Sequence, residues 1–310
     1  MSSAANTMTD TRPAPHPTAP FTWSVRREIW EHRAVWIAPL AAAGLILFSF
    51  LIRMFKLPYL LDQANHLAPM PRAAAIGAPF AIAAFTIMVT ATVVSFFFCL
   101  GALNNERRDR SVLFWKSLPV SDTTTVLAKA FVPLVVVPLI AIGTIIVTQL
   151  VMLLLGTIVL TANNISPAVI WTGWPLPQFE LTMLYVLVTG VIWYAPIYAW
   201  VLMISSWARR VAFLWAVLPW LGLFIVEKIA FGTDYVGSFI DYRINGSIKE
   251  GLNLPNGNHN ININTMPVID PSHYVSPAHF LMSPGLWLGL LAAAVFISAA
   301  IWFRRVGDPG

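Results

Sequence analysis

The stretch NNERRDRSVLFWKSLPVSDTTTVLAK, residues 104–129, decides how this chain is organised. Its first part is heavily charged, in a chain of which only 11% of residues are charged. Long apolar runs flank it on both sides, and runs of about 18 or more apolar residues indicate membrane-spanning helices. The stretch is therefore a polar connection between two predicted spans.

The composition agrees with a membrane location. Of 310 residues, 57% are apolar, and the mean hydropathy is +0.70. A soluble domain of this size needs more charge to cover its surface. The 23 prolines and 13 tryptophans suit kinked spans and interfacial anchors. The single cysteine, Cys99, excludes an intrachain disulfide. We predict an all-α polytopic membrane protein.

Hydropathy predicts six spans, and the third is unusually long. The spans cover residues 34–52, 79–103, 127–160, 180–207, 211–230 and 284–303. At about 1.5 Å per residue the third span reaches about 50 Å, against a hydrocarbon core of about 30 Å. We expect it to tilt, to kink at Pro133 or Pro138, or to project into the cytosol.

The distribution of Lys and Arg predicts that both termini are cytosolic. With the N-terminus inside, thirteen of the nineteen basic residues lie on the cytosolic side, in agreement with the positive-inside rule. The net charge of +5 reflects this asymmetry. No run of five or more basic residues points to nucleic acid, and we expect no nucleic-acid partner.

Two segments precede the first span. Residues 1–20 are rich in Pro, Ala and Thr, which predicts a disordered cytosolic tail. Residues 21–33 place apolar side chains at helical spacing, with Arg26, Arg27, Glu28 and Arg33 on other faces. This pattern predicts an amphipathic interfacial helix; the alternative is simply the cytosolic start of the first span.

Two segments between predicted spans are expected on the outer side of the membrane. Residues 163–180, NNISPAVIWTGWPLPQFE, contain Trp171 and Trp174 and are expected to lie at the membrane surface. The outer segment 231–283 contains VGSFIDYRINGSI, whose spacing predicts a short amphipathic helix at 236–244. The following NGNHNININTMPVIDP fits either a short strand or an ordered loop.

The spans lack the groups that catalysis requires. None of the six histidines lies well inside a span, which argues against metalloprotease and serine-hydrolase chemistry. Only Glu180 and Glu227 approach the spans, and both are near span ends. Glu227 is either an interfacial helix-end residue or part of a gate. A membrane path with so little charge argues against a proton-driven carrier.

Nucleotide hydrolysis is not expected in this chain either. A phosphate-binding loop needs Gly-Lys followed by Ser or Thr, and none of the five lysines follows a glycine. We therefore predict no catalytic, cofactor-binding or metal-ligating residues and no enzymatic activity. If the protein moves a cargo against a gradient, the energy enters through another subunit.

Within the opening stretch, residues 106–118 predict a short cytosolic helix. Val112, Trp115 and Leu118 share one edge, and Pro119 ends the helix. Ser121 or Asp122 is then placed to cap the next helix. An exposed Trp and Leu beside basic residues is typical of a protein contact surface. The alternative is a plain loop on the headgroups, with Trp115 as a lipid anchor.

The motif ERRDRSVLFWKSLPVSDTTTVLAKA resembles the segment between the second and third spans of permease subunits of type-2 ABC transporters. The resemblance implies a permease that assembles with two ATPase subunits, which bind ATP and Mg²⁺, and with a second permease copy, identical or paralogous. It also implies a coupling helix that sits in a groove of the ATPase. This role is carried over to Glu106, Arg107, Asp109, Arg110, Ser111, Phe114, Trp115, Ser117, Leu118 and Pro119.

The resulting hypothesis is an ATP-driven exporter in a bacterial inner membrane, with a lipid-like, amphipathic or peptide cargo. The run GVIWYAPIYAW could line its path, or it could simply pack between helices. The proposed path residues are Trp193, Tyr194, Tyr198 and Trp200. The alternative function is a non-transporting assembly or sensor subunit that binds a partner through its outer segment.

Overall fold

The computed structural model describes residues 19–67, 69–108, 120–172, 176–208, 210–252 and 275–306. Within these ranges the chain is helical, and its only β-type pairing is an isolated bridge between Leu252 and Val275. Six helices are long and apolar enough to cross a membrane. The prediction of an all-α, multi-pass membrane protein is therefore confirmed.

The first half of the chain contains three of the six spans. Its elements are α1 (Ala19–Glu31), α2 (Ala34–Met54), α3 (Leu57–Asn65), α4 (Pro69–Ala102), α5 (Asn104–Arg108), α7 (Asp122–Phe131), the π-helical turn η1 (Val132–Val136) and α8 (Val137–Ala162). The second half contains the other three. Its elements are α9 (Ala168–Thr172), α10 (Leu176–Trp207), α11 (Ala212–Ala230), α12 (Tyr235–Gly251), α14 (Pro277–Met282) and α15 (Pro284–Val306).

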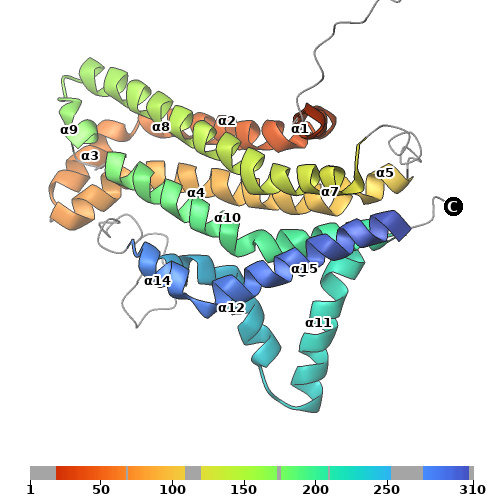
Figure 1. Cartoon of the computed structure of the whole chain (residues 1–310). Helices are drawn as coiled ribbons and strands as arrows, with labels where there is room; N and C mark the ends of the chain where they lie inside the picture. The colour runs from red at the N-terminus through yellow and green to blue at the C-terminus, as the bar shows by residue number, and fades with distance from the viewer. Residues whose placement is uncertain are drawn as a thin grey trace, which may run out of the picture.

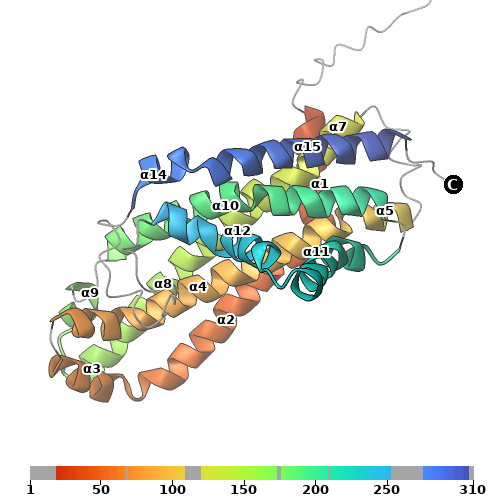
Figure 2. The same ribbon diagram turned by 90° about the horizontal axis from the view of Figure 1, so that it is seen from below.

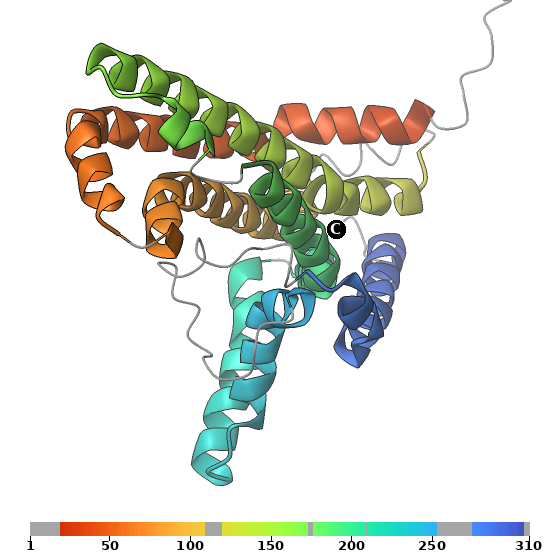
Figure 3. The same ribbon diagram turned by 90° about the vertical axis from the view of Figure 1, so that its left-hand side faces the viewer.

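The spans pack as two groups that meet along α4 and α10 (Figure 1). Helices α2, α4 and α8 contact one another, and α10 packs extensively along α15 (Figure 2). The main apolar core lies between the groups and includes Ile87, Ile145 and Leu202, each almost completely buried. Helix α11 and the start of α12 project from this bundle, as Figure 3 shows, while the rest of α12 packs against α10.

The third span changes its geometry where the sequence indicates. A continuous helical run extends from Asp122 to Ala162, and the π-helical turn within it contains Pro133 and ends just before Pro138. A proline lacks the N–H that closes a helical turn, and its ring crowds the carbonyl four residues earlier. A π-turn accommodates both effects. The helix thus changes its hydrogen-bond pattern at Pro133, one of the two prolines at which a kink was predicted, and the run is longer than the predicted 127–160.

The start of α1 and the end of α15 lie at the same end of the bundle, together with α5 and α7 (Figure 1). We call this the termini end and the opposite end, with α3, α9 and α14, the far end. Helix α1 runs across the spans rather than along them (Figures 1 and 3). That direction suits an interfacial helix. Which end faces the cytosol stays a prediction from the positive-inside rule.

The face of α1 that the sequence assigned to solvent is partly buried. Helix α1 packs against α7, with Val25 buried and the rings of Phe21 and Phe131 edge-to-face at 5.5 Å. Glu28, expected on a polar face, is only 1% exposed. Trp23 and Trp30, by contrast, are about two-thirds exposed, at 65% and 67%. Except for its last two residues, the predicted tail 1–20 lies outside the described residues.

The far end contains the predicted outer helix. Helix α12 (Tyr235–Gly251) covers the expected 236–244 and continues beyond it. Within this helix, the lack of a side chain at Gly246 allows the ring of Trp193 to approach the backbone. The surface segment forms the short α9, and the indole of Trp171 donates to Thr157 Oγ1 at 3.0 Å. Trp174 and the stretch NGNHNININTMPVIDP lie outside the described residues.

Candidate functional site

Six charged side chains meet at the termini end, between helices that are far apart in the sequence. We call this group the charge cluster. It consists of Arg27, Glu28, Glu106, Asp122, Lys129 and Arg304. Its members come from α1, α5, α7 and α15. The cluster therefore joins the N-terminal helix and the last span to both sides of the stretch 109–119.

Lys129 of α7 lies at the centre of the cluster. Its Nζ is 2.8 Å from Glu28 Oε1 and 3.1 Å from Glu106 Oε1. The side chains of Lys129 and Glu28 are each only 1% exposed. An ammonium buried this deeply is stable only when carboxylates compensate its charge, and two do so here.

Arg304 of α15 binds two carboxylates at once. Its Nη1 is 2.9 Å from Glu106 Oε2, and its Nε is 2.9 Å from Asp122 Oδ1. Glu106 precedes the stretch 109–119 and Asp122 follows it. One guanidinium thus fixes both ends of that stretch to the last span. Its planar, forked donors suit this double contact better than a lysine would.

Backbone contacts hold the same region in place. The buried hydroxyl of Ser205 on α10 accepts from the N–H groups of Leu103 and Asn104, both at 3.0 Å. Ser121 caps α7, because its Oγ accepts from the Thr124 N–H at 3.1 Å. Of the two predicted caps, Ser121 is therefore correct, whereas Asp122 pairs with Arg304 instead.

The charges of the cluster balance, with three carboxylates against three cations. Arg27 shows the competition between burial and pairing. Burial alone would lower the pKa of its guanidinium, but Glu28, Glu106 and Glu31 outweigh that effect and raise it. Removing one member of a buried, paired set typically costs about 3–5 kcal/mol, because the remaining partner keeps an uncompensated charge.

Of the residues assigned to the coupling helix, the structure describes two. Glu106 is 8% exposed and bound by Lys129, Arg27 and Arg304 within the chain. Arg107 lies on α5. Asp109, Arg110, Ser111, Phe114, Trp115, Ser117, Leu118 and Pro119 lie outside the described residues. Their contact with an ATPase stays a prediction.

The four proposed path residues hold helices together. Trp193 is fully buried and donates to the Arg243 carbonyl at 3.0 Å, and Tyr194 donates to the Ile244 carbonyl at 2.7 Å. Trp200 donates to the Ala216 carbonyl at 3.1 Å, and Tyr198 is 6% exposed. These contacts match the packing interpretation of the run, which ties α10 to α11 and α12.

The two carboxylates near span ends differ sharply. Glu227 accepts from the Thr233 hydroxyl at 2.7 Å and from the N–H groups of Tyr235 at 2.5 Å and Val236 at 2.7 Å. It therefore caps the start of α12, in agreement with the helix-end interpretation. Among the residues that the structure describes, neither buried carboxylate oxygen of Glu180 completes a hydrogen bond, although the Gln149 amide lies close to them.

The charge cluster cannot be recognised from local sequence patterns. Its six members are spread from residue 27 to residue 304, so no local spacing connects them. The available signal was Lys129, a single lysine inside the predicted third span. A charge at that position requires a partner. Comparisons with protein-family models, curated proteins and solved structures return no match to this chain.

Proposed function

We propose that this chain is the membrane-embedded permease subunit of an ATP-driven ABC transporter, and that it exports a lipid-like, amphipathic or peptide cargo. The termini end then faces the cytosol of a bacterial cell. Two ATPase subunits bind there and supply the energy. This assignment rests on the resemblance of residues 106–130. It also rests on the ion pairs of Glu106 and Asp122, which lie on either side of residues 109–119.

The observation that carries the proposal is the double contact of Arg304 with Glu106 and Asp122. A cytosolic helix can transmit movement to the membrane only if its ends are rigidly attached. Here both ends are bound to α15, and Lys129 and Glu28 continue the connection to α1. A push on the stretch 109–119 is therefore distributed to several helices together rather than absorbed by a loose loop.

The attachment also reaches α10, the span that packs most extensively against α15. Leu103 and Asn104, which lead into α5, donate to Ser205 near the end of α10. Movement of α5 is thereby passed to both groups of spans. In the proposed cycle, closure of the ATPases moves the termini end and opens the path toward the far end.

The second permease copy is proposed to pack against the wing formed by α11 and α12. Of the six spans α11 is the least buried, with 11% of its most apolar window buried against 22% to 44% in the others. A span at the edge of a bundle can face lipid on one side without a protein partner. Because α11 projects from the bundle, two of its sides are exposed, and a second copy could cover one of them. Stacked rings of Trp220 and Phe239 join it to α12, at 5.8 Å.

The proposal is tested by copurification and by ATP turnover. The tagged permease, expressed in its native host, is expected to retain an ATPase that hydrolyses ATP. Trp115→Ala and Leu118→Asp are expected to release that ATPase or to uncouple hydrolysis from transport. Interface anchors typically contribute about 2 kcal/mol or more. Lys116→Ala, on the rim of the same helix, is the matched control and is expected to have a small, salt-sensitive effect.

Two outcomes would decide against this function. If no ATPase copurifies and the partner is instead held through the outer segment, the chain is an assembly or sensor subunit. If an ATPase is bound but both Trp115→Ala and Leu118→Asp leave association and coupled transport normal, residues 106–118 are not the coupling element.

A further inference from the structure

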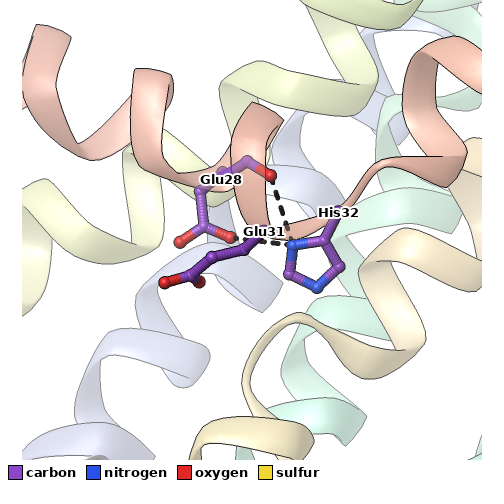
Figure 4. Close-up of side chains that lie close together, drawn as sticks. All are labelled: Glu28, Glu31 and His32. Atoms are coloured by element: carbon purple, nitrogen blue, oxygen red, sulfur yellow. Dashed lines mark hydrogen bonds and ion pairs between the residues drawn. The ribbon is translucent and has the colours of Figure 1, made fainter.

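Three ligand-type side chains gather where α1 ends and the chain turns into α2. Glu28, Glu31 and His32 offer two carboxylates and one imidazole at positions i, i+3 and i+4 (Figure 4). Their ligand atoms all lie within 4.8 Å of one another. The group belongs to neither a span nor the stretch 109–119. Glu28 is also a member of the charge cluster, but the proposed transport function uses neither Glu31 nor His32.

Glu28 presents one oxygen to this group and keeps the other for the charge cluster. Oε1 accepts from Lys129 and from Arg27, at 2.8 Å and 2.7 Å. Oε2 is buried and accepts no hydrogen bond within the described ranges, and it faces His32 Nδ1 at 3.6 Å. A buried carboxylate oxygen without a donor is costly, and such an oxygen is available to coordinate a cation.

The other two ligands have complementary properties. The His32 ring packs edge-on against Phe98 at 4.9 Å. Metal binding requires the tautomer in which Nδ1 carries no proton, and in that tautomer the 3.3 Å contact of Nδ1 with the Glu28 carbonyl oxygen is not a hydrogen bond. The Glu31 side chain is 45% exposed, and its nearest cation, Arg27 Nε, lies 3.6 Å away. Glu31 can therefore adjust its position, and its exposure gives an ion a route to the buried oxygen of Glu28.

We propose that Glu28, Glu31 and His32 bind a divalent transition-metal ion of the zinc class. Zinc bonds of about 2.0–2.2 Å in a tetrahedral site separate ligand atoms by about 3.3 Å. The 3.6 Å between Oε2 and Nδ1 is close to that separation. The exposed carboxylate of Glu31 would supply the third ligand atom. An imidazole with two carboxylates favours zinc-class ions over Mg²⁺, and water would fill the fourth position.

The surroundings have the features of a metal site. Lys129 and Arg27 bind the other oxygen of Glu28 and so fix the orientation of the ligand carboxylate, as outer partners do in metalloproteins. The three acids and three bases of the charge cluster cancel, and Glu31 adds one negative charge. A bound ion would connect the last turn of α1 to residue 32, and so fix the angle at which α1 crosses the spans.

The test uses the whole chain, purified in detergent with a tag that lacks histidine and stripped with a chelator. Titration with Co²⁺ is expected to give the visible absorption of a tetrahedral site at one equivalent, and Zn²⁺ is expected to displace it. His32→Ala and Glu31→Gln are each expected to weaken binding at least tenfold. Glu28→Gln is unsuitable because it also removes a partner of Lys129.

His279→Ala is the matched control, because His279 also lies 3.6 Å from a carboxylate, Glu250, at the far end. Its affinity for Co²⁺ is expected to equal that of the unchanged protein. Co²⁺ binding that survives His32→Ala with unchanged affinity would overturn the proposal. So would the absence of Co²⁺ uptake by the unchanged protein.

Discussion

Glu106 and Asp122 bind the same guanidinium, that of Arg304, each at 2.9 Å. The two acids stand on either side of the charged stretch that separates the second and third spans. Their shared partner lies on the sixth span, 182 residues beyond Asp122. The described residues on either side of the stretch 109–119 are thus held together by one guanidinium.

Arg304 and its neighbour Arg305 provide a matched pair of substitutions. Arg304→Met leaves Glu106 and Asp122 without their shared cation and is expected to destabilise the protein by about 3 kcal/mol. Arg305 is exposed and makes only a 3.3 Å contact with Thr123. Arg305→Met is expected to change stability by about 0.5 kcal/mol or less. Thermal unfolding followed by tryptophan fluorescence measures both; equal effects would contradict a special role for Arg304.

The Lys129–Glu28 pair is expected to show strong coupling. Lys129→Met and Glu28→Gln should each cost about 3 kcal/mol, since each removes one charge from a buried, balanced set and leaves its partners less well compensated. The double variant is expected to lose clearly less than the sum, because the two losses share one interaction. Denaturant unfolding of the four proteins gives the coupling free energy. Simple additivity would show that the pair does not act as a unit.

Glu180 and Glu227 are expected to respond in opposite ways to replacement by Gln. Glu180→Gln removes an unpaired buried carboxylate and should leave the melting temperature unchanged or raise it. Glu227→Gln weakens the three hydrogen bonds that cap α12 and should cost about 1–3 kcal/mol. A marked loss of stability in Glu180→Gln would mean that its carboxylate has a partner in the membrane.

The topology is tested with single cysteines in a Cys99→Ala background. Ser238→Cys and Val306→Cys both occupy exposed positions; residue 238 lies in the predicted outer segment 231–283, and residue 306 ends α15 at the termini end. An impermeant thiol reagent applied to intact cells is expected to label position 238 and not 306. Ser247 would be a poor reporter, because it is only 5% exposed. Labelling of 306 alone would reverse the orientation.

Hydropathy was sufficient to predict the spans, because each must present apolar side chains to lipid along its whole length. The start of α7 was also predictable, since a serine before a polar first turn is a local signal. The helix α12 followed from spacing alone, although its contact with Trp193 did not. All these features depend on neighbours within a few residues of each other.

The interior of the termini end was not predictable in this way. Glu28 lies among charged residues that resemble a solvated helix face, and nothing local shows that α7 covers it. The group of Glu28, Glu31 and His32 was missed for a related reason. Its spacing differs from that of the HExxH metal-binding motif. The burial of Glu28 Oε2 becomes evident only in the folded chain, where α7 and Lys129 pack beside Glu28. Long-range pairing decides both cases.

The place of Arg304 in the sequence has a consequence for biosynthesis. It lies on the sixth span, C-terminal to the other five, so it is synthesised after them. Until the sixth span inserts, Asp122 and Glu106 Oε2 lack their shared guanidinium, although Arg27 and Lys129 can already bind Glu106 Oε1. Insertion of α15 therefore completes the charge cluster, and a chain truncated before residue 304 would present acidic oxygens by which quality-control proteases could distinguish it.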